Sequence, residues 1–150
     1  MGAEARLAAD HRALDGLLAE GLSALEAGNI DQAHRSLDRL WMRLAVHIRA
    51  EHKALFPAVL AARPDLADLL SRLRADHDLF MEGLARLLPR LKAPAPDLAA
   101  LRSELGLLEA RLAEHNAREE ADVYPAAARE DALDLAVARE LAFLPERYGV

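Results

Sequence analysis

Cysteine is absent from the 150-residue chain, which excludes disulfide bonds, thiolate zinc sites and thiol catalysis. Basic residues are outnumbered, and the formal net charge of −6 argues against a nucleic-acid partner, since phosphates favour a basic surface. Long apolar runs are also missing: the longest uncharged stretch near the middle, Ala54 to Ala62, is too short to span a bilayer. The N-terminus lacks an apolar signal segment. We therefore expect one soluble, cytoplasmic domain over residues 1–150, without nucleic-acid or membrane contacts.

Apolar residues recur at spacings of three and four almost throughout, which is the period of an α-helix. Gly28-Asn29 and the stretch Lys92–Asp97 interrupt the pattern, and Asp31 is expected to cap the second helix. Pro57 falls inside the second helical stretch, which predicts a kink or an early end near Phe56. The predicted helices cover about 4–27, 31–62, 64–91, 97–124 and 131–144. Short connections between long helices indicate an all-α, antiparallel up-down-up-down four-helix bundle with a short C-terminal fifth helix.

The chain contains an internal duplication. Two stretches 68 residues apart, His47 to Pro57 and His115 to Pro125, share the pattern H-x-x-x-E-[HE]-x-x-x-[FY]-P. Asp10-His11 recurs as Asp76-His77, 66 residues later. Each half therefore supplies a lone histidine and a His-x-x-x-Glu pair.

Six of these side chains are expected to meet inside the bundle. Residues four apart share one helix face, and counting from the turns places both lone histidines and both pairs at the same depth. Two buried carboxylates in one layer repel each other unless protons or cations intervene. The alternatives are a buried polar network without metal and a site for two bridged cations; we favour the second. The candidate ligands are His11, His47, Glu51, His77, His115 and Glu119.

Imidazole and carboxylate without thiolate suit iron, manganese or zinc. Six protein ligands shared by two ions leave positions for water, a bridging oxo or hydroxo group, or an exogenous ligand. The chain has neither the Glu-x-x-His pairs of other di-iron bundles nor the His-Glu-x-x-His of zinc proteases.

This order of ligands resembles the hemerythrin-like family, also called HHE cation-binding domains. Its pattern is a histidine on the first helix, H-x-x-x-E on the second, a histidine on the third and H-x-x-x-[ED] on the fourth, often followed by E-x-x-[LV]-[FY]-P. The resemblance covers nearly the whole chain. It implies a centre of two non-haem iron ions held by the six residues and bridged by Glu51 and Glu119, with manganese or zinc as substitutes.

One departure from the oxygen-carrying members bears on function. Those members have a further histidine one turn from the third-helix histidine, whereas this chain has Leu73 and Met81 four residues to either side. The coordination is expected to be more open, which favours reaction with O2, peroxide or NO over reversible oxygen carriage. His52 is a candidate fifth imidazole or, with Glu120 and Tyr124, an outer partner of the ligands.

Three classes of function follow from the resemblance and the residues. The first is a di-iron protein that binds or senses O2, or handles NO or peroxide. The second is an enzyme for peroxide disproportionation or iron-centre repair, although the missing cysteine weakens the repair hypothesis; no catalytic residue is assigned. The third is a non-catalytic, metal-responsive interaction module with an unidentified protein partner.

Overall fold

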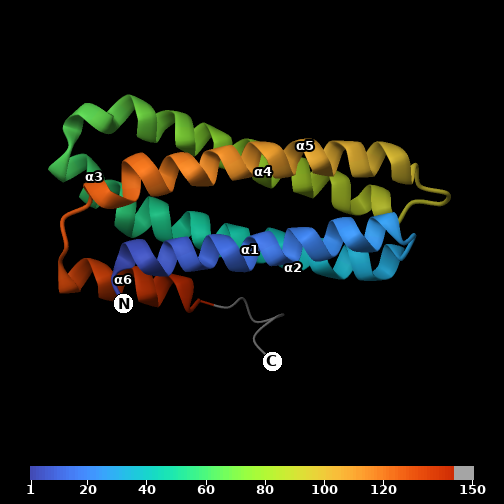
Figure 1. Ribbon diagram of the computed structural model, residues 1–150, viewed down its shortest axis with the longest axis horizontal. Helices are drawn as coiled ribbons and strands as arrows, with labels where there is room; N and C mark the ends of the chain where they lie inside the picture. The colour runs from blue at the N-terminus through green and yellow to red at the C-terminus, as the bar shows by residue number, and fades with distance from the viewer. Residues whose placement is uncertain (144–150) are drawn as a thin grey trace.

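Four long helices run side by side in alternating directions (Figure 1). They are α1 (Ala3–Glu26), α2 (Ile30–Ala50), α4 (Ala67–Leu91) and α5 (Leu98–Arg118) in a computed structural model that describes residues 1–143. Helix α1 packs against α2 and α5, and α4 packs against the same two helices. The predicted all-α, up-down-up-down bundle is confirmed, and no strand occurs within the described residues.

The turns follow from local backbone chemistry. Gly28 adopts a φ of +74°, a left-handed conformation that costs glycine little, and α1 ends there. The expectation that Asp31 caps α2 is wrong: Asn29 is the cap, and its side chain accepts a hydrogen bond from the backbone N–H of Gln32. Asp97 caps α5 in the same way.

The second helical stretch continues through its proline motif to Ala62, whereas the fourth ends just after its own, at Ala126. Each passes through a π-helical turn, η1 (Glu51–Leu55) before α3 (Phe56–Ala62) and η3 (Glu119–Val123) before the short 3₁₀ turn η4 (Tyr124–Ala126). Of the two outcomes expected near Phe56, a kink or an early end, the helix therefore shows an irregular turn before Phe56 and continues beyond it. Proline cannot donate a hydrogen bond and its ring clashes with the carbonyl four residues earlier, and a wider turn avoids this clash. A 3₁₀ turn, η2 (Pro64–Leu66), then leads into α4.

The apolar core consists of two clusters, one toward each end of the bundle. Along every long helix a predicted ligand lies between them: His11, for example, falls between Leu7 of one cluster and Leu14 of the other. The polar layer is thus enclosed above and below by packed side chains that exclude water.

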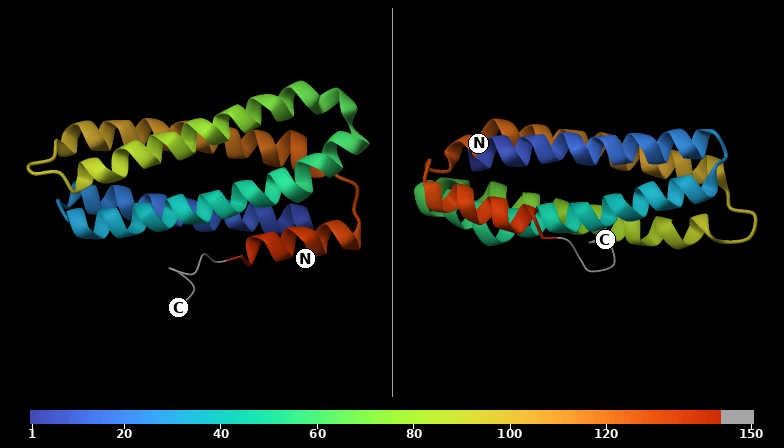
Figure 2. Two further views of the ribbon diagram at one scale, coloured as in Figure 1. Left: turned by 180° about the vertical axis from the view of Figure 1, so that it is seen from behind. Right: turned by 90° about the horizontal axis from the view of Figure 1, so that it is seen from below.

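The C-terminal helix α6 (Asp131–Leu141) lies along α1 and α2 beside the N-terminus (Figure 2). The backbone N–H of Ala3 donates a 2.7 Å hydrogen bond to Asp134 Oδ1, and Val137 is buried against the bundle. The helix was predicted to reach Leu144, which lies outside the described residues. Across residues 1–143, none of the helices combines the length and apolar character needed to cross a membrane.

Candidate metal centre

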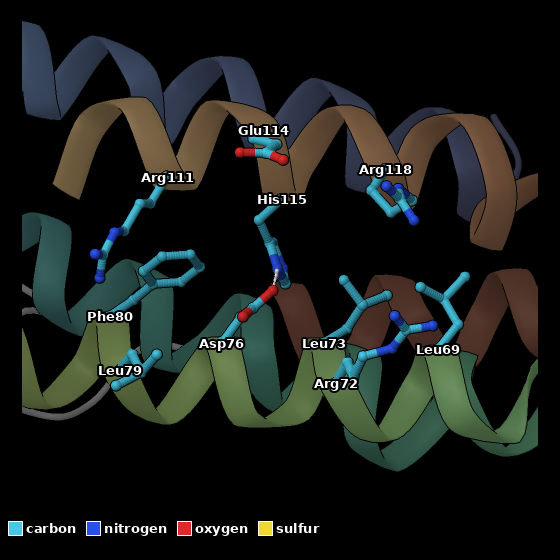
Figure 3. A pocket seen from close by; sticks show the side chains of 10 residues that line it. All are labelled: Leu69, Arg72, Leu73, Asp76, Leu79, Phe80, Arg111, Glu114, His115 and Arg118. Atoms are coloured by element: carbon cyan, nitrogen blue, oxygen red, sulfur yellow. Dashed lines mark hydrogen bonds and ion pairs between the residues drawn. The ribbon is translucent and has the colours of Figure 1, made fainter. Parts of the chain in front are cut away.

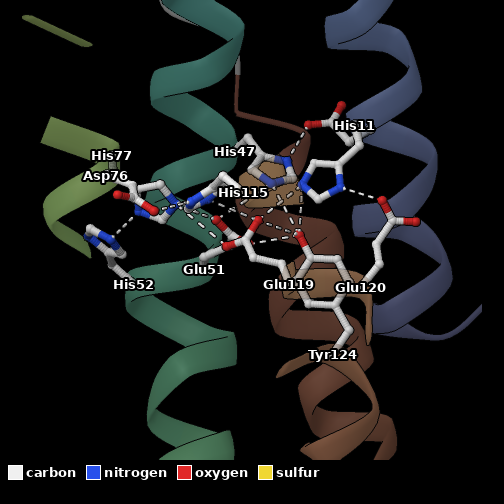
Figure 4. A network of polar contacts seen from close by, with 11 residues as sticks. His11, His47, Glu51, His52, Asp76, His77, His115, Glu119, Glu120 and Tyr124 are labelled. Carbon is white, nitrogen blue, oxygen red and sulfur yellow. Dashed lines mark hydrogen bonds and ion pairs between the residues drawn. The ribbon is translucent and has the colours of Figure 1, made fainter. Parts of the chain in front are cut away.

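The six predicted ligands converge in one layer between the two core clusters (Figure 4). Each of the four long helices contributes one imidazole, and each π-helical turn opens with one of the two glutamates. All six side chains are at most 4% exposed. The counting argument from the turns was therefore right about depth and direction.

The two carboxylates lie between the imidazoles of the two halves. Glu119 Oε1 is 3.2 Å from His11 Nε2 and 3.3 Å from His115 Nε2. Glu51 Oε1 is 3.1 Å from His77 Nε2 and 3.6 Å from His47 Nε2. Glu119 Oε2 also lies 3.5 Å from His77 Nε2, so each glutamate faces imidazoles from both halves, as a carboxylate shared by two cations would.

The donor atoms form two overlapping groups that could each hold a cation. One group contains His11, His47, Glu51 and Glu119, and the other His77, His115 and Glu119, with donor atoms within 4.8 Å of one another in each group. We call the first group position I and the second position II. Glu119 belongs to both.

Every imidazole turns Nε2 inward and offers Nδ1 to a partner outside the cluster. Asp10 lies 2.9 Å from His47 Nδ1, and Asp76 lies 3.0 Å from His115 Nδ1. Glu120 lies 3.0 Å from His11 Nδ1, and His52 Nε2 lies 2.8 Å from His77 Nδ1. Such partners fix the tautomer and orientation of a ligand imidazole, leaving Nε2 free to bind a cation.

His52 is consequently an outer partner in this structure, because its Nε2 faces His77 and not the cluster. Burial lowers its pKa to about 4, with help from the charges of His77 and Arg74. Glu120 also takes the outer role expected of it.

The carboxylates shift the imidazoles toward the protonated form. Burial opposes a charge on His47, but the charge of Glu51 and the hydrogen bond to Asp10 outweigh it and raise its pKa to about 10. Burial likewise opposes a charge on His77, but Glu119 and Glu51 raise its pKa to about 9. A cation that enters the cluster has to displace these protons.

Two buried carboxylate oxygens receive no hydrogen bond from the described residues, Glu51 Oε1 and Glu119 Oε2. Imidazole nitrogens approach them to 3.1 and 3.5 Å, but without the geometry of a hydrogen bond. An unsatisfied buried oxygen is costly, and it costs more on a charged group. Cations bridged by these oxygens would satisfy both, so the donor set fits a two-ion centre of the kind that binds iron, manganese or zinc.

A protein-family comparison agrees with this geometry. The model of the hemerythrin HHE cation-binding domain matches residues 3–127. The chain belongs to the hemerythrin family. The comparisons with curated proteins and with solved structures gave no match.

Within this hemerythrin-like domain Tyr124 lies closer to the candidate ligands than expected, since it was predicted only as an outer partner. Its hydroxyl lies inside the cluster, donating a 2.7 Å hydrogen bond to Glu51 Oε2 and lying 3.0 Å from His11 Nε2 (Figure 4). Burial and the charges of Glu51 and Glu119 raise the pKa of Tyr124 well above its usual range, so the phenol stays protonated.

The hemerythrin-like centre approaches solvent at a pocket of about 390 Å³ between α4 and α5 (Figure 3). His115 and its partner Asp76 lie at this pocket, among arginine and apolar side chains. A second pocket of about 500 Å³ reaches the ring of Tyr124 from the side of α6. The first pocket thus reaches one candidate ligand, His115, and the second is lined by Tyr124 and by none of the six candidate ligands.

Sequence analysis missed two participants, Asp10 and Asp76. The signal was present, because the duplicated pair Asp-His includes both of them. Only the histidines of the two Asp-His pairs were predicted to take part in the site.

Proposed function

We propose that the six-residue cluster binds two non-haem iron ions bridged by Glu51 and Glu119, and that this centre binds or senses O2 or handles NO or peroxide. The observation that carries the proposal is the pair of buried carboxylate oxygens without hydrogen bonds, Glu51 Oε1 and Glu119 Oε2, which both face the imidazole of His77. Manganese or zinc could occupy the same donors.

The chain supplies geometry and a dry enclosure, and bound iron would supply the redox chemistry. Each imidazole is held by an outer partner, so little reorientation is needed when a cation binds. The two core clusters enclose the layer, which favours a small ligand such as a diatomic molecule or peroxide. Two imidazoles per position leave room for such a ligand, which supports sensing or reaction over a closed structural site.

The test is anaerobic loading of chelator-treated protein with Fe(II), followed by iron analysis, Mössbauer spectroscopy and addition of NO. We expect two iron ions per chain, magnetic coupling after oxidation, and a new visible spectrum with NO. His115→Ala should lose one iron per chain, whereas His34→Ala, on α2 away from the cluster, should keep both. Protein that binds no iron, or binds it equally well without His115, contradicts the proposal.

Peroxide disproportionation is a second candidate, favoured by the Tyr124 hydroxyl. A phenol hydrogen-bonded to Glu51 inside a dry cluster is placed to donate a hydrogen bond to a small oxygen ligand instead. Oxygen evolution from hydrogen peroxide would fall in Tyr124→Phe by at least roughly tenfold, with iron content unchanged. Equal evolution by both proteins, or none, excludes this role.

A further inference from the structure

The two metal positions differ in their surroundings even though the chain is duplicated. Asp10 and Asp76 are equivalent residues, because each immediately precedes the lone histidine of its half. Both accept a hydrogen bond from a ligand imidazole. Arg43, which forms an ion pair with Asp10, has its counterpart in Arg111, which lines the pocket beside Asp76. The two aspartates thus serve both positions alike, whereas the Arg43 ion pair belongs to position I.

The outer partners of the lone histidines also distinguish the two positions. His11 at position I donates to the carboxylate of Glu120, whereas His77 at position II faces the imidazole of His52. For His77 to bind a cation through Nε2, its Nδ1 must carry the proton and donate it to His52 Nε2. His52 is then a neutral acceptor. A carboxylate acceptor makes an imidazole a stronger donor to metal than a neutral acceptor does.

The residue before each proline adds a second difference in the same direction. Tyr124 places its hydroxyl 3.0 Å from His11 and 3.4 Å from His47, both at position I. The equivalent Phe56 has no hydroxyl and stacks on His77 at position II, with ring centroids 5.9 Å apart. Position I therefore has a carboxylate, Glu120, where position II has His52, and a hydroxyl, that of Tyr124, where position II has the bare ring of Phe56.

We propose that the positions fill in order, position I first and tightly, position II second and exchangeably, and that His52 sets this difference as a positioning residue behind His77. The inference rests on the proposed two-ion centre. It implies a stable form of the protein with one ion, in which position II is open to exchange of metal with its surroundings.

Zinc chloride is the probe, because zinc is diamagnetic and has no redox chemistry. Chelator-treated protein with isotope-labelled histidines is titrated and followed by NMR and calorimetry. The first equivalent should shift the ring signals of His11 and His47, and the second those of His77 and His115. The second binding constant should be weaker by at least roughly tenfold.

Variants test the role of His52. His52→Glu should tighten the second site by roughly tenfold and leave the first unchanged, since it restores the carboxylate found in the other half. His52→Gln, also neutral, should keep the wild-type order, and the mirror exchange Glu120→His should weaken the first site. His34→Glu, the same exchange at a position on α2 away from the cluster, should change neither.

Three results would overturn the inference: one equivalent of zinc divided between the positions, filling of position II first, or no change of the second site in folded His52→Glu. The order of filling in the wild-type protein decides the matter even if the variant does not fold. Two ions bound with equal affinity would refute only the inequivalence. Failure of the cluster to bind any metal would refute the proposed centre as well.

Discussion

Metal uptake by this cluster should release protons, and the number can be worked out from the structure. Neighbouring carboxylates raise the pKa of His47 to about 10 and of His77 to about 9. Both imidazoles are therefore protonated at pH 7 to 8, and both must lose that proton to bind a cation through Nε2. The pKa of His115 is also raised, because hydrogen bonds to Glu119 and Asp76 outweigh its burial. We expect at least two protons released per chain.

The proton count fixes how metal affinity depends on pH. Each displaced proton changes the binding free energy by about 1.4 kcal/mol per pH unit, so two protons change it by about 3 kcal/mol. The product of the two binding constants should fall about a hundredfold between pH 8 and pH 7. Metal affinity falls as the pH falls, because protons compete with the cation for the imidazole nitrogens.

Calorimetry of zinc binding in two buffers of different ionisation heat measures this release directly. Release of less than one proton per chain would refute the reasoning, because it would mean that the imidazoles are already neutral in the metal-free protein. Tyr124→Phe is the control: the raised pKa of Tyr124 predicts that its phenol keeps its proton. Wild type and variant should then release the same number, and one extra proton from the wild type would show that the phenolate binds metal.

Further predictions concern the metal-free fold, each followed by urea unfolding. Tyr124→Phe should lower the free energy of unfolding by about 2 kcal/mol, since Glu51 loses a 2.7 Å hydrogen bond in a buried site; unchanged stability would argue against that bond. Gly21→Ala should cost about 1–3 kcal/mol, because the new Cβ would lie 2.5 Å from Leu37 Cδ2, whereas Gly16→Ala on the same helix meets nothing within 4 Å and should add about 0.5–1 kcal/mol. The protonated imidazoles of His47 and His77 stabilise the fold fully below pH 6.5, and this stabilisation is lost as pH rises through about 9 to 10. The free energy of unfolding should therefore decline between pH 6.5 and 10; an increase would contradict the ion pairs of these imidazoles with Glu51 and Glu119.

The fold and the six candidate ligands were predictable because the helical spacing and the internal duplication agree. The helical spacing of three and four gives the bundle, and the duplication places a histidine or a His-x-x-x-Glu pair at the same depth on each helix. Glu120 was predicted as an outer partner, but the outer carboxylates Asp10 and Asp76 were not. Asp10 stands one residue before His11, about 100° around the helix, where a helical pattern indicates solvent. In the bundle that direction faces the neighbouring helix, and Asp10 meets His47 there.

The position of Tyr124 could not be read from an α-helical pattern either. Five residues after Glu119, a regular helix would turn Tyr124 about 140° away from it. In the π-helical turn the backbone N–H of Tyr124 bonds to the carbonyl of Glu119, five residues back, and this brings the two side chains to one face. Their oxygens lie 3.4 Å apart as a result.

The π-helical turns also connect the two prolines to the ligand glutamates. In both halves the carbonyl that accepts the five-residue hydrogen bond belongs to a glutamate of the cluster, and the donor immediately precedes a proline. Pro57 and Pro125 cannot donate to the carbonyl four residues back, which removes a hydrogen bond that would favour a regular turn. The [FY]-P ending of the duplicated motif thus widens the helix just beyond each glutamate and turns the aromatic residue toward the cluster. Because that residue is phenylalanine in one half and tyrosine in the other, the hydroxyl group of Tyr124 adds to the chemical difference that Glu120 and His52 make between the two halves of the centre.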